Sequence, residues 1–317
     1  MAAFSRSTGL LGAVLVTILV TSASEKALAN TDRKAVSLLP THVATVVGIN
    51  LQQCRVSKLC RRVVRAAKKA ESWDTILTQL ERASGLNVSA QAKRLYIGLP
   101  VDFETSNAAV VILDGPIRPM TERRALAQNV RQTRYRSYPV WTFPGSDAGS
   151  FVTLGDRLLF ANEKRDLFVV LDRLQALKNL DGEPARPRRM DVLAARAATH
   201  MDVWFIRDME ALRRAGQVRD PIWRQTRVIL GAANFHRGID LRANLLMNNV
   251  GAAAVITGWI HQLHGIPFQS QLLGLMGMGS IGDHLTANPR GRRVEIQMQV
   301  RPQELSRLLA TTLAWLH

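Results

Sequence analysis

The stretch that decides the fold is residues 227–264, RVILGAANFHRGIDLRANLLMNNVGAAAVITGWIHQLH. On both sides of His236-Arg237-Gly238, apolar residues fall at every second position, which is the period of a strand with one buried face. Gly238 can adopt a positive φ without steric cost, so the two runs are predicted to pair as a β-hairpin.

A helix is predicted directly after this hairpin. Asn248 and Asn249 are favourable N-cap residues, and apolar residues then recur at helical spacing through residue 263. We therefore expect the hairpin to be covered on one face by its own helix.

The same plan of strand, polar corner and helix recurs along the chain. It begins at residues 42–50, 158–162, 202–206 and 294–300. Neighbouring strands elsewhere are joined by short turns, which favour antiparallel pairing. The predicted fold class is α+β, with antiparallel sheets and helices packed on one face, and two ferredoxin-like halves are one arrangement compatible with it.

The N-terminus has the features of a signal peptide. Arg6 precedes an uncharged apolar run at residues 9–20, and Ala27-Leu28-Ala29 is typical of a cleavage site. A membrane span needs about twenty apolar residues, so the run is short for an anchor. We expect residues 1–29 to direct export to the periplasm or the exterior, with an uncleaved tether as the alternative.

The remaining chain is predicted to form two domains. Residues 181–190, DGEPARPRRM, combine Gly, Pro and charge with no large apolar residue before Met190. We expect an N-terminal α+β domain at 30–180, a linker at 181–190 and a C-terminal α+β domain at 191–317.

The chain is strongly basic, and one predicted helix concentrates that charge. It has 42 basic and 25 acidic residues, a net charge of +17, and Arg accounts for most of the basic residues. On a helical wheel from residue 58, one side is basic and the other is apolar. The basic side is either a solvated face or a contact for anionic polymer, lipid headgroups or a partner protein. Its residues are Lys58, Arg61, Arg62, Arg65, Lys68 and Lys69.

Cys54 and Cys60 are the two cysteines of the chain. On a continuous helix, six residues correspond to a rotation of about 240° around the helix axis. The two thiols would then point in different directions and could not form a disulfide. If Ser57 is an N-cap, however, Cys54 lies in a non-helical lead-in and can fold back towards Cys60. A disulfide, two buried free thiols and a reactive or metal-binding pair all remain open.

Residues 266–285 are apolar but rich in glycine, which suits a rigid helix poorly. They are interpreted either as a loop and short helix over the hairpin's core or as an apolar flap that contacts a ligand or partner. The candidate contact residues are Phe268, Leu272, Leu275, Met276 and Met278.

Signals for catalysis and cofactors are weak. His261 and His264 lie three apart on a predicted helix, but no HExxH pattern accompanies them, so no metal site is predicted. The glycines of GLMGMG at residues 274–279 do not follow the order of a GxGxxG loop. We expect neither a cofactor nor catalytic residues.

These observations favour binding over catalysis. The leading hypothesis is an exported, non-enzymatic binding or scaffold protein of the bacterial cell envelope that uses its basic face, with no specific nucleic acid as partner. A lipid or small apolar-ligand carrier built around residues 239–285 is the second hypothesis. An exported hydrolase, which would require His261, His264 and Asp283 to converge, is the third.

Overall fold

The structure is a computed structural model, and its described residues form two compact units, which divide between Arg196 and Ala197. This division lies six residues after the end of the predicted 181–190 linker, so residues 191–196, predicted to begin the C-terminal domain, belong to the N-terminal unit. Residues 181–188 and residues 1–29 lie outside the described residues. The structure describes residues 34–61, 78–83, 85, 87–103, 108–121, 125, 129–145, 149–179, 189–194, 196–197, 201–236, 238–265 and 285–301.

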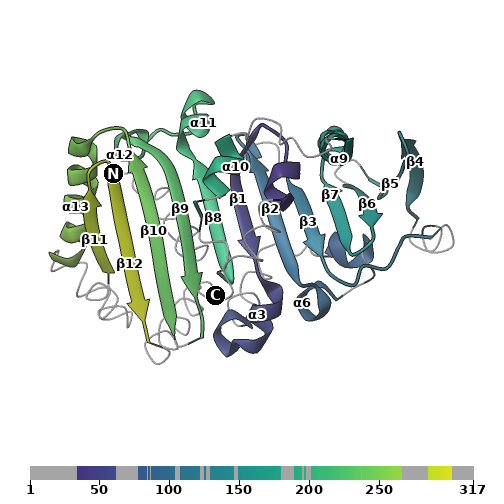
Figure 1. Cartoon of the computed structure of the whole chain (residues 1–317), viewed down its shortest axis with the longest axis horizontal. Coiled ribbons are helices and arrows are strands. Elements are labelled where there is room, and N and C mark those ends of the chain that lie inside the picture. Colours follow the sequence, from purple (N-terminus) through teal and green to yellow (C-terminus); the bar gives the residue numbers. More distant parts are fainter. Residues whose placement is uncertain are drawn as a thin grey trace. The chain divides into compact units, whose positions relative to one another are not determined.

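The N-terminal unit is built on an antiparallel sheet with the order β1-β2-β3-β7-β6-β5-β4 (Figure 1). The sheet packs against α9, which contacts β6 and β7. Its strands are β1 (Val43–Ile49), β2 (Arg94–Pro100), β3 (Val110–Asp114), β4 (Arg131–Tyr135), β5 (Tyr138–Thr142), β6 (Ser150–Leu154) and β7 (Arg157–Ala161). Its helices are α3 (Leu51–Val56), α6 (Val88–Gln91), α9 (Lys164–Asn179) and α10 (Arg189–Ala194).

In the C-terminal unit five strands pair antiparallel in the order β11-β12-β10-β9-β8 (Figure 1). Its strands are β8 (Val203–Asp208), β9 (Thr226–Asn234), β10 (Ile239–Met247), β11 (Leu285–Arg290) and β12 (Arg293–Val300). Its helices are α11 (Met209–Arg214), α12 (Pro221–Arg224) and α13 (Val250–Gly265). The predicted α+β class with antiparallel sheets is thereby confirmed.

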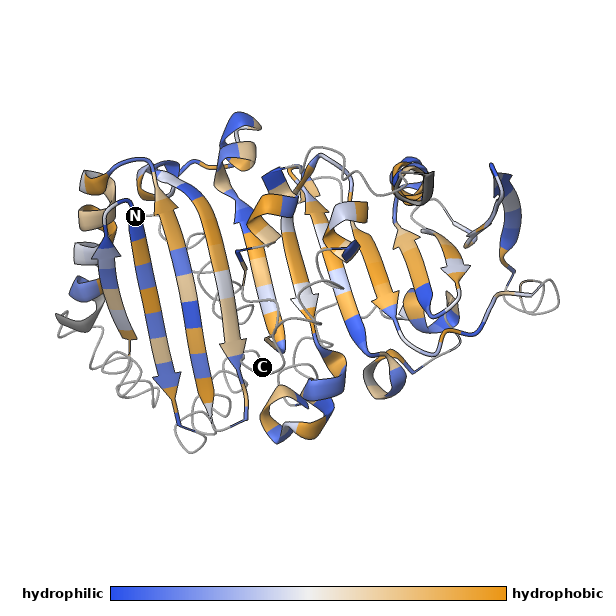
Figure 2. Cartoon of the chain, viewed as in Figure 1, coloured by the Kyte–Doolittle hydropathy of each residue, from blue (hydrophilic) through white to orange (hydrophobic). Residues whose placement is uncertain are grey.

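The hairpin and helix predicted in residues 227–264 are confirmed as β9, β10 and α13. Gly238 has a φ of 110° in the turn between the strands, a value that favours glycine. Strand β10 alternates as predicted, because Leu241 and Leu245 are buried while Arg242 is exposed. Figure 2 shows this alternation as apolar and polar stripes along β10 and β12.

Helix α13 covers the apolar face of the sheet at β10, β11 and β12. Ile256 and Ile260 from the helix pack with Leu245 and Val294 from the strands in one buried cluster. Asn249 caps the helix, since its Oδ1 accepts a hydrogen bond from the Ala252 N–H at 2.8 Å.

Two strands were not predicted, and the strands are not arranged as ferredoxin-like halves. Strand β4 has four exposed residues out of five, and β11 contains Pro289, so neither has an apolar alternation to recognise. A ferredoxin-like half contains a βαβ unit with parallel strands. Every strand pairing described within the two units is antiparallel.

Among the described residues, no helix combines the length and the apolar character needed to cross a bilayer.

The close packing of β8 on β9 predicts the effect of one substitution. Gly231 faces Phe205 across the two strands, and a Cβ at position 231 would overlap the Phe205 ring. Gly231→Ala should lower the free energy of unfolding by about 1–3 kcal/mol, the usual cost of overpacking. Denaturant titration measures the change.

The matched control is Gly258→Ala in α13, where a Cβ would meet no atom within 4 Å. Because alanine favours a helix interior, this variant should gain up to about 1 kcal/mol. Equal stabilities for the two variants would contradict the packing described for Phe205.

Candidate functional site

The Cys54–Cys60 disulfide closes a sharp corner between two helical segments. Ser57 ends α3 in an extended conformation, with ψ at 118°. Its Oγ then accepts a hydrogen bond from the Cys60 N–H at 3.2 Å, so the same residue caps the next segment. This bend brings the two Cα atoms to 5.0 Å, within the range for a disulfide. Residues 54–61 are called the disulfide corner below.

The N-cap role expected for Ser57 is confirmed, but the expected conformation of Cys54 is wrong. Cys54 lies in α3 and not in a non-helical lead-in. The break at Ser57, and not an unwound approach to it, is what turns the two thiols towards each other. Of the alternatives left open by the sequence, the structure has the disulfide.

The inner side of the corner is buried and anchored to the rest of the unit. Cys54 and Cys60 are at most 3% exposed, and Leu51, which precedes the corner in α3, is 5% exposed. The Arg55 guanidinium donates to the Ala90 carbonyl oxygen, and the Gln52 N–H donates to the Lys93 carbonyl oxygen at 3.1 Å. These contacts hold the corner against α6 and the start of β2.

The outer side of the corner combines cations with an apolar tip. Lys58 and Arg61 are exposed, and Val56 beside them is 78% exposed. The helical wheel predicted a basic side and an apolar side, and the structure agrees over this turn: Lys58 and Arg61 are exposed, and Cys60 is buried. The exposed valine was missed, because nothing in the sequence shows that the helix breaks directly after it.

Most of the other predicted site residues lie outside the described residues. This holds for the basic residues Arg62, Arg65, Lys68 and Lys69, and for the apolar residues Phe268, Leu272, Leu275, Met276 and Met278. The described part of the basic helix is therefore its first turn.

The arrangement at the corner suits attraction to an anionic surface. A single exposed ion pair contributes about 0–1 kcal/mol, so two cations bind one small anion weakly. An extended anionic surface can contact both cations at once. The net positive charge of the whole protein adds a long-range attraction to these two contacts. Val56 can make an apolar contact when the cations are docked.

A second polar arrangement involves His42, just before β1, and Asp166 in α9. The His42 Nε2 lies 3.3 Å from the Asp166 Oδ2, and the carboxylate is buried. The hydrogen bond with Asp166 raises the pKa of His42. The pair connects the entrance of β1 to α9, and we assign it no catalytic role.

His261 has a structural contact. Its Nε2 lies 3.0 Å from the Ala287 carbonyl oxygen, which joins α13 to β11. The side chain of His264 and all of Asp283 lie outside the described residues, so the convergence with His261 that an exported hydrolase would require is not tested. Within the described parts of both units, no three His, Cys, Asp or Glu residues gather as metal ligands do.

Asp202, just before β8, is an unusual buried acid. It is 0% exposed, and neither carboxylate oxygen has a hydrogen-bond partner among the described residues. Burial penalises its charged form and raises its pKa to about 7. The sequence gives no sign of this, because burial at residue 202 depends on the tertiary fold.

The raised pKa of Asp202 predicts a stability that falls with pH. Between about pH 4 and pH 7 the folded protein holds a proton that the unfolded chain has released, so raising the pH favours unfolding. The loss should be on the order of a few kcal/mol. Urea denaturation at pH 5 and pH 8 measures it.

Asp202→Asn should lose much less stability over the same interval, because the amide does not ionise. Exposed Asp156 provides the control, and Asp156→Asn should retain the wild-type pH dependence. An unchanged dependence in Asp202→Asn would show that another group is responsible.

The disulfide predicts sensitivity to reductant. Reduction should lower the free energy of unfolding by about 2 kcal/mol, as expected for a cross-link that closes a short loop. Denaturation with and without reductant measures the loss, and Cys54→Ala/Cys60→Ala should show no further loss. Two titratable thiols in the unfolded, unreduced protein would contradict the bond.

Comparisons with known proteins give a distant structural similarity. No protein-family model matches the chain, and no curated protein matches it. The chain is similar to crystal form I of TP0453, with a TM-score of 0.47 and 10% identity over 92% of this chain and 98% of that one. Crystal form IV of TP0453 gives a TM-score of 0.46 and 9% identity over 89% and 98%.

Proposed function

We propose that the protein is an exported, non-enzymatic binding protein that attaches to an anionic surface of the cell envelope through the disulfide corner. The observation that carries this proposal is the outer side of the corner, where Lys58 and Arg61 are exposed beside Val56. A covalent link and a buried inner side hold these residues in one orientation.

The charge of the chain supports an anionic target. The net charge is +17, so the protein is attracted to any anionic surface at low salt. Near an anionic membrane surface each Lys or Arg contributes about 1 kcal/mol. The two described cations thus supply a useful share of attachment, and this share weakens as salt shortens the screening length.

The disulfide supports the proposed compartment. Disulfides persist in oxidising environments such as the periplasm and the exterior, and both cysteines of the chain are in this bond. The apolar run at residues 9–20 favours the same destination.

Fixed geometry supports attachment more than a free tail would. Side chains on a rigid element lose less conformational entropy on binding than side chains on a loose segment. The Arg55 contact with Ala90 and the Ser57 cap limit movement of the corner, so the two cations approach a surface together.

Co-sedimentation with lipid vesicles tests the proposal. The oxidised protein without residues 1–29 should bind phosphatidylglycerol vesicles at low salt, release at high salt, and leave phosphatidylcholine vesicles unbound. Lys58→Glu/Arg61→Glu should weaken binding by about thirtyfold or more, because it removes two contacts of about 1 kcal/mol each.

The matched control reverses two exposed arginines in the other unit, Arg214→Glu/Arg219→Glu, and has the same net charge. This control should bind far better than the corner variant. Equal loss in the two variants would show that net charge alone drives attachment and would overturn the assignment to the corner. Val56→Ser should weaken binding without changing its salt dependence.

A further inference from the structure

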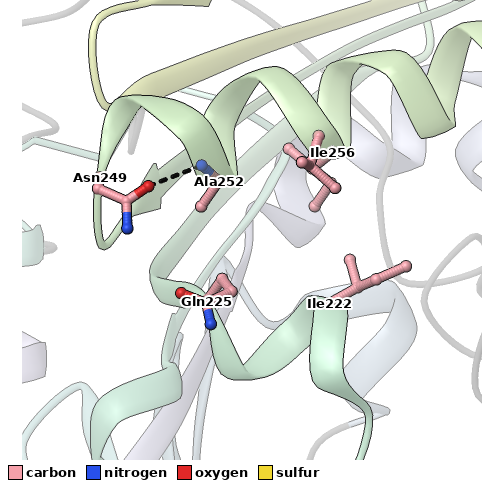
Figure 3. Close-up of a pocket in the computed structure, with 6 residues that line it drawn as sticks. Ile222, Gln225, Asn249, Ala252 and Ile256 are labelled. Carbon is pink, nitrogen blue, oxygen red and sulfur yellow. Dashed lines mark hydrogen bonds between the residues drawn. The ribbon is translucent and has the colours of Figure 1, made fainter.

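The C-terminal unit contains a groove of about 280 Å³ between α12 and the first turns of α13 (Figure 3). Its six lining residues are Ile222, Gln225, Asn249, Ala252, Val255 and Ile256. The groove belongs to the C-terminal unit, whereas the disulfide corner belongs to the N-terminal unit.

The groove is apolar in its depth. Ile256 is buried, Ile222 and Ala252 are half-buried, and Val255 at the rim is 64% exposed. Figure 3 shows Ile222 and Ile256 on facing sides, one from each helix. Exposure thus increases from the floor to the rim, as in a site that takes an apolar chain from solvent.

Two amides, Asn249 and Gln225, lie at the other end of the groove, and their oxygens are already engaged. The Asn249 Oδ1 accepts from the Ala252 N–H at 2.8 Å, and the Gln225 Oε1 accepts from the Asn248 side-chain amide at 3.2 Å. Each side chain therefore has its NH₂ group left to offer, and both residues are exposed. In Figure 3 the Asn249 nitrogen points from α13 towards α12.

These donors select the chemistry of a ligand's polar end. An NH₂ group donates, so the partner must be an oxygen acceptor such as a carboxylate. Asn249 is also the N-cap of α13, and the N-terminus of a sixteen-residue helix favours negative charge. None of the six lining residues is charged, so none of these side chains repels a carboxylate electrostatically.

From this geometry we propose that the groove binds a short single-chain amphiphile with a carboxylate head group, such as a medium-chain fatty acid. The head group accepts hydrogen bonds from the Asn249 and Gln225 amides. The alkyl chain lies along Ile222, Ala252 and Ile256. A groove of about 280 Å³ lies near the lower limit of ligand pockets, which fits one short chain better than a two-chain lipid.

Calorimetric titration of the full chain with octanoate tests the proposal, with tryptophan fluorescence as a second readout because Trp223 and Trp259 pack against the neighbouring cluster. Octanoate should bind saturably, with a Kd on the order of 0.1–1 mM. Octylamine, which has the same chain and a cationic head group, should bind at least about tenfold more weakly, a difference of 1.4 kcal/mol. Equal binding of the two would overturn the head-group assignment.

Two variants locate the site. Ala252→Phe fills the groove and should abolish saturable binding, while Ala254→Phe, at an exposed position of the same helix, should leave it unchanged. Octanoate binding that survives Ala252→Phe would overturn the site.

Asn249→Asp keeps the test valid if Ala252→Phe fails to fold. Aspartate caps a helix as well as asparagine does, so the fold is retained while the NH₂ donor is replaced by a negative oxygen. This variant should bind octanoate at least about tenfold more weakly. Unchanged octanoate binding by a folded Asn249→Asp would contradict the role of the amide.

Discussion

Antiparallel backbone pairing is the constraint on which the strands of each unit depend, because it fixes the face on which each side chain lies. In the C-terminal unit, Leu241 is paired with Met298 and Arg242 with Gln297. A slip of one residue would turn Arg242 into the core. The same pairing fixes the start of α13, since the Met247 N–H donates to the Arg292 carbonyl oxygen at 2.8 Å, only three residues before the helix begins.

Much of this architecture could be predicted from the sequence, because an element with one buried face has apolar residues at regular spacing. The hairpin, α13 and β12 all show such a period, and the structure has them where it was found. Strand β4 shows none, since it lies at the edge of its sheet and four of its five residues are exposed. Strand β11 is also an edge strand, where a proline is tolerated because one side of the strand needs no ladder hydrogen bond.

The candidate sites divide in the same way between local and tertiary information. The exposed Lys58 and Arg61 could be predicted, because a helical wheel needs only local spacing. The disulfide could not be decided, because it depends on whether the chain bends at Ser57. The groove was invisible in the sequence, because the β9–β10 hairpin must first return the chain before the Asn248 N–H can donate to the Gln225 carbonyl oxygen at 2.8 Å.

The two proposed sites share a preference for negative charge but obtain it by different physics. At the corner, attraction comes from exposed cations, acts over about a Debye length and fades with salt. In the groove, no lining residue is charged, and discrimination comes from amide donors that act only at hydrogen-bond distance. An anionic amphiphile would thus be drawn towards the protein by its net charge of +17, while Asn249 and Gln225 would decide whether it stays. Salt should therefore change how fast such a ligand arrives more than how firmly the groove holds it.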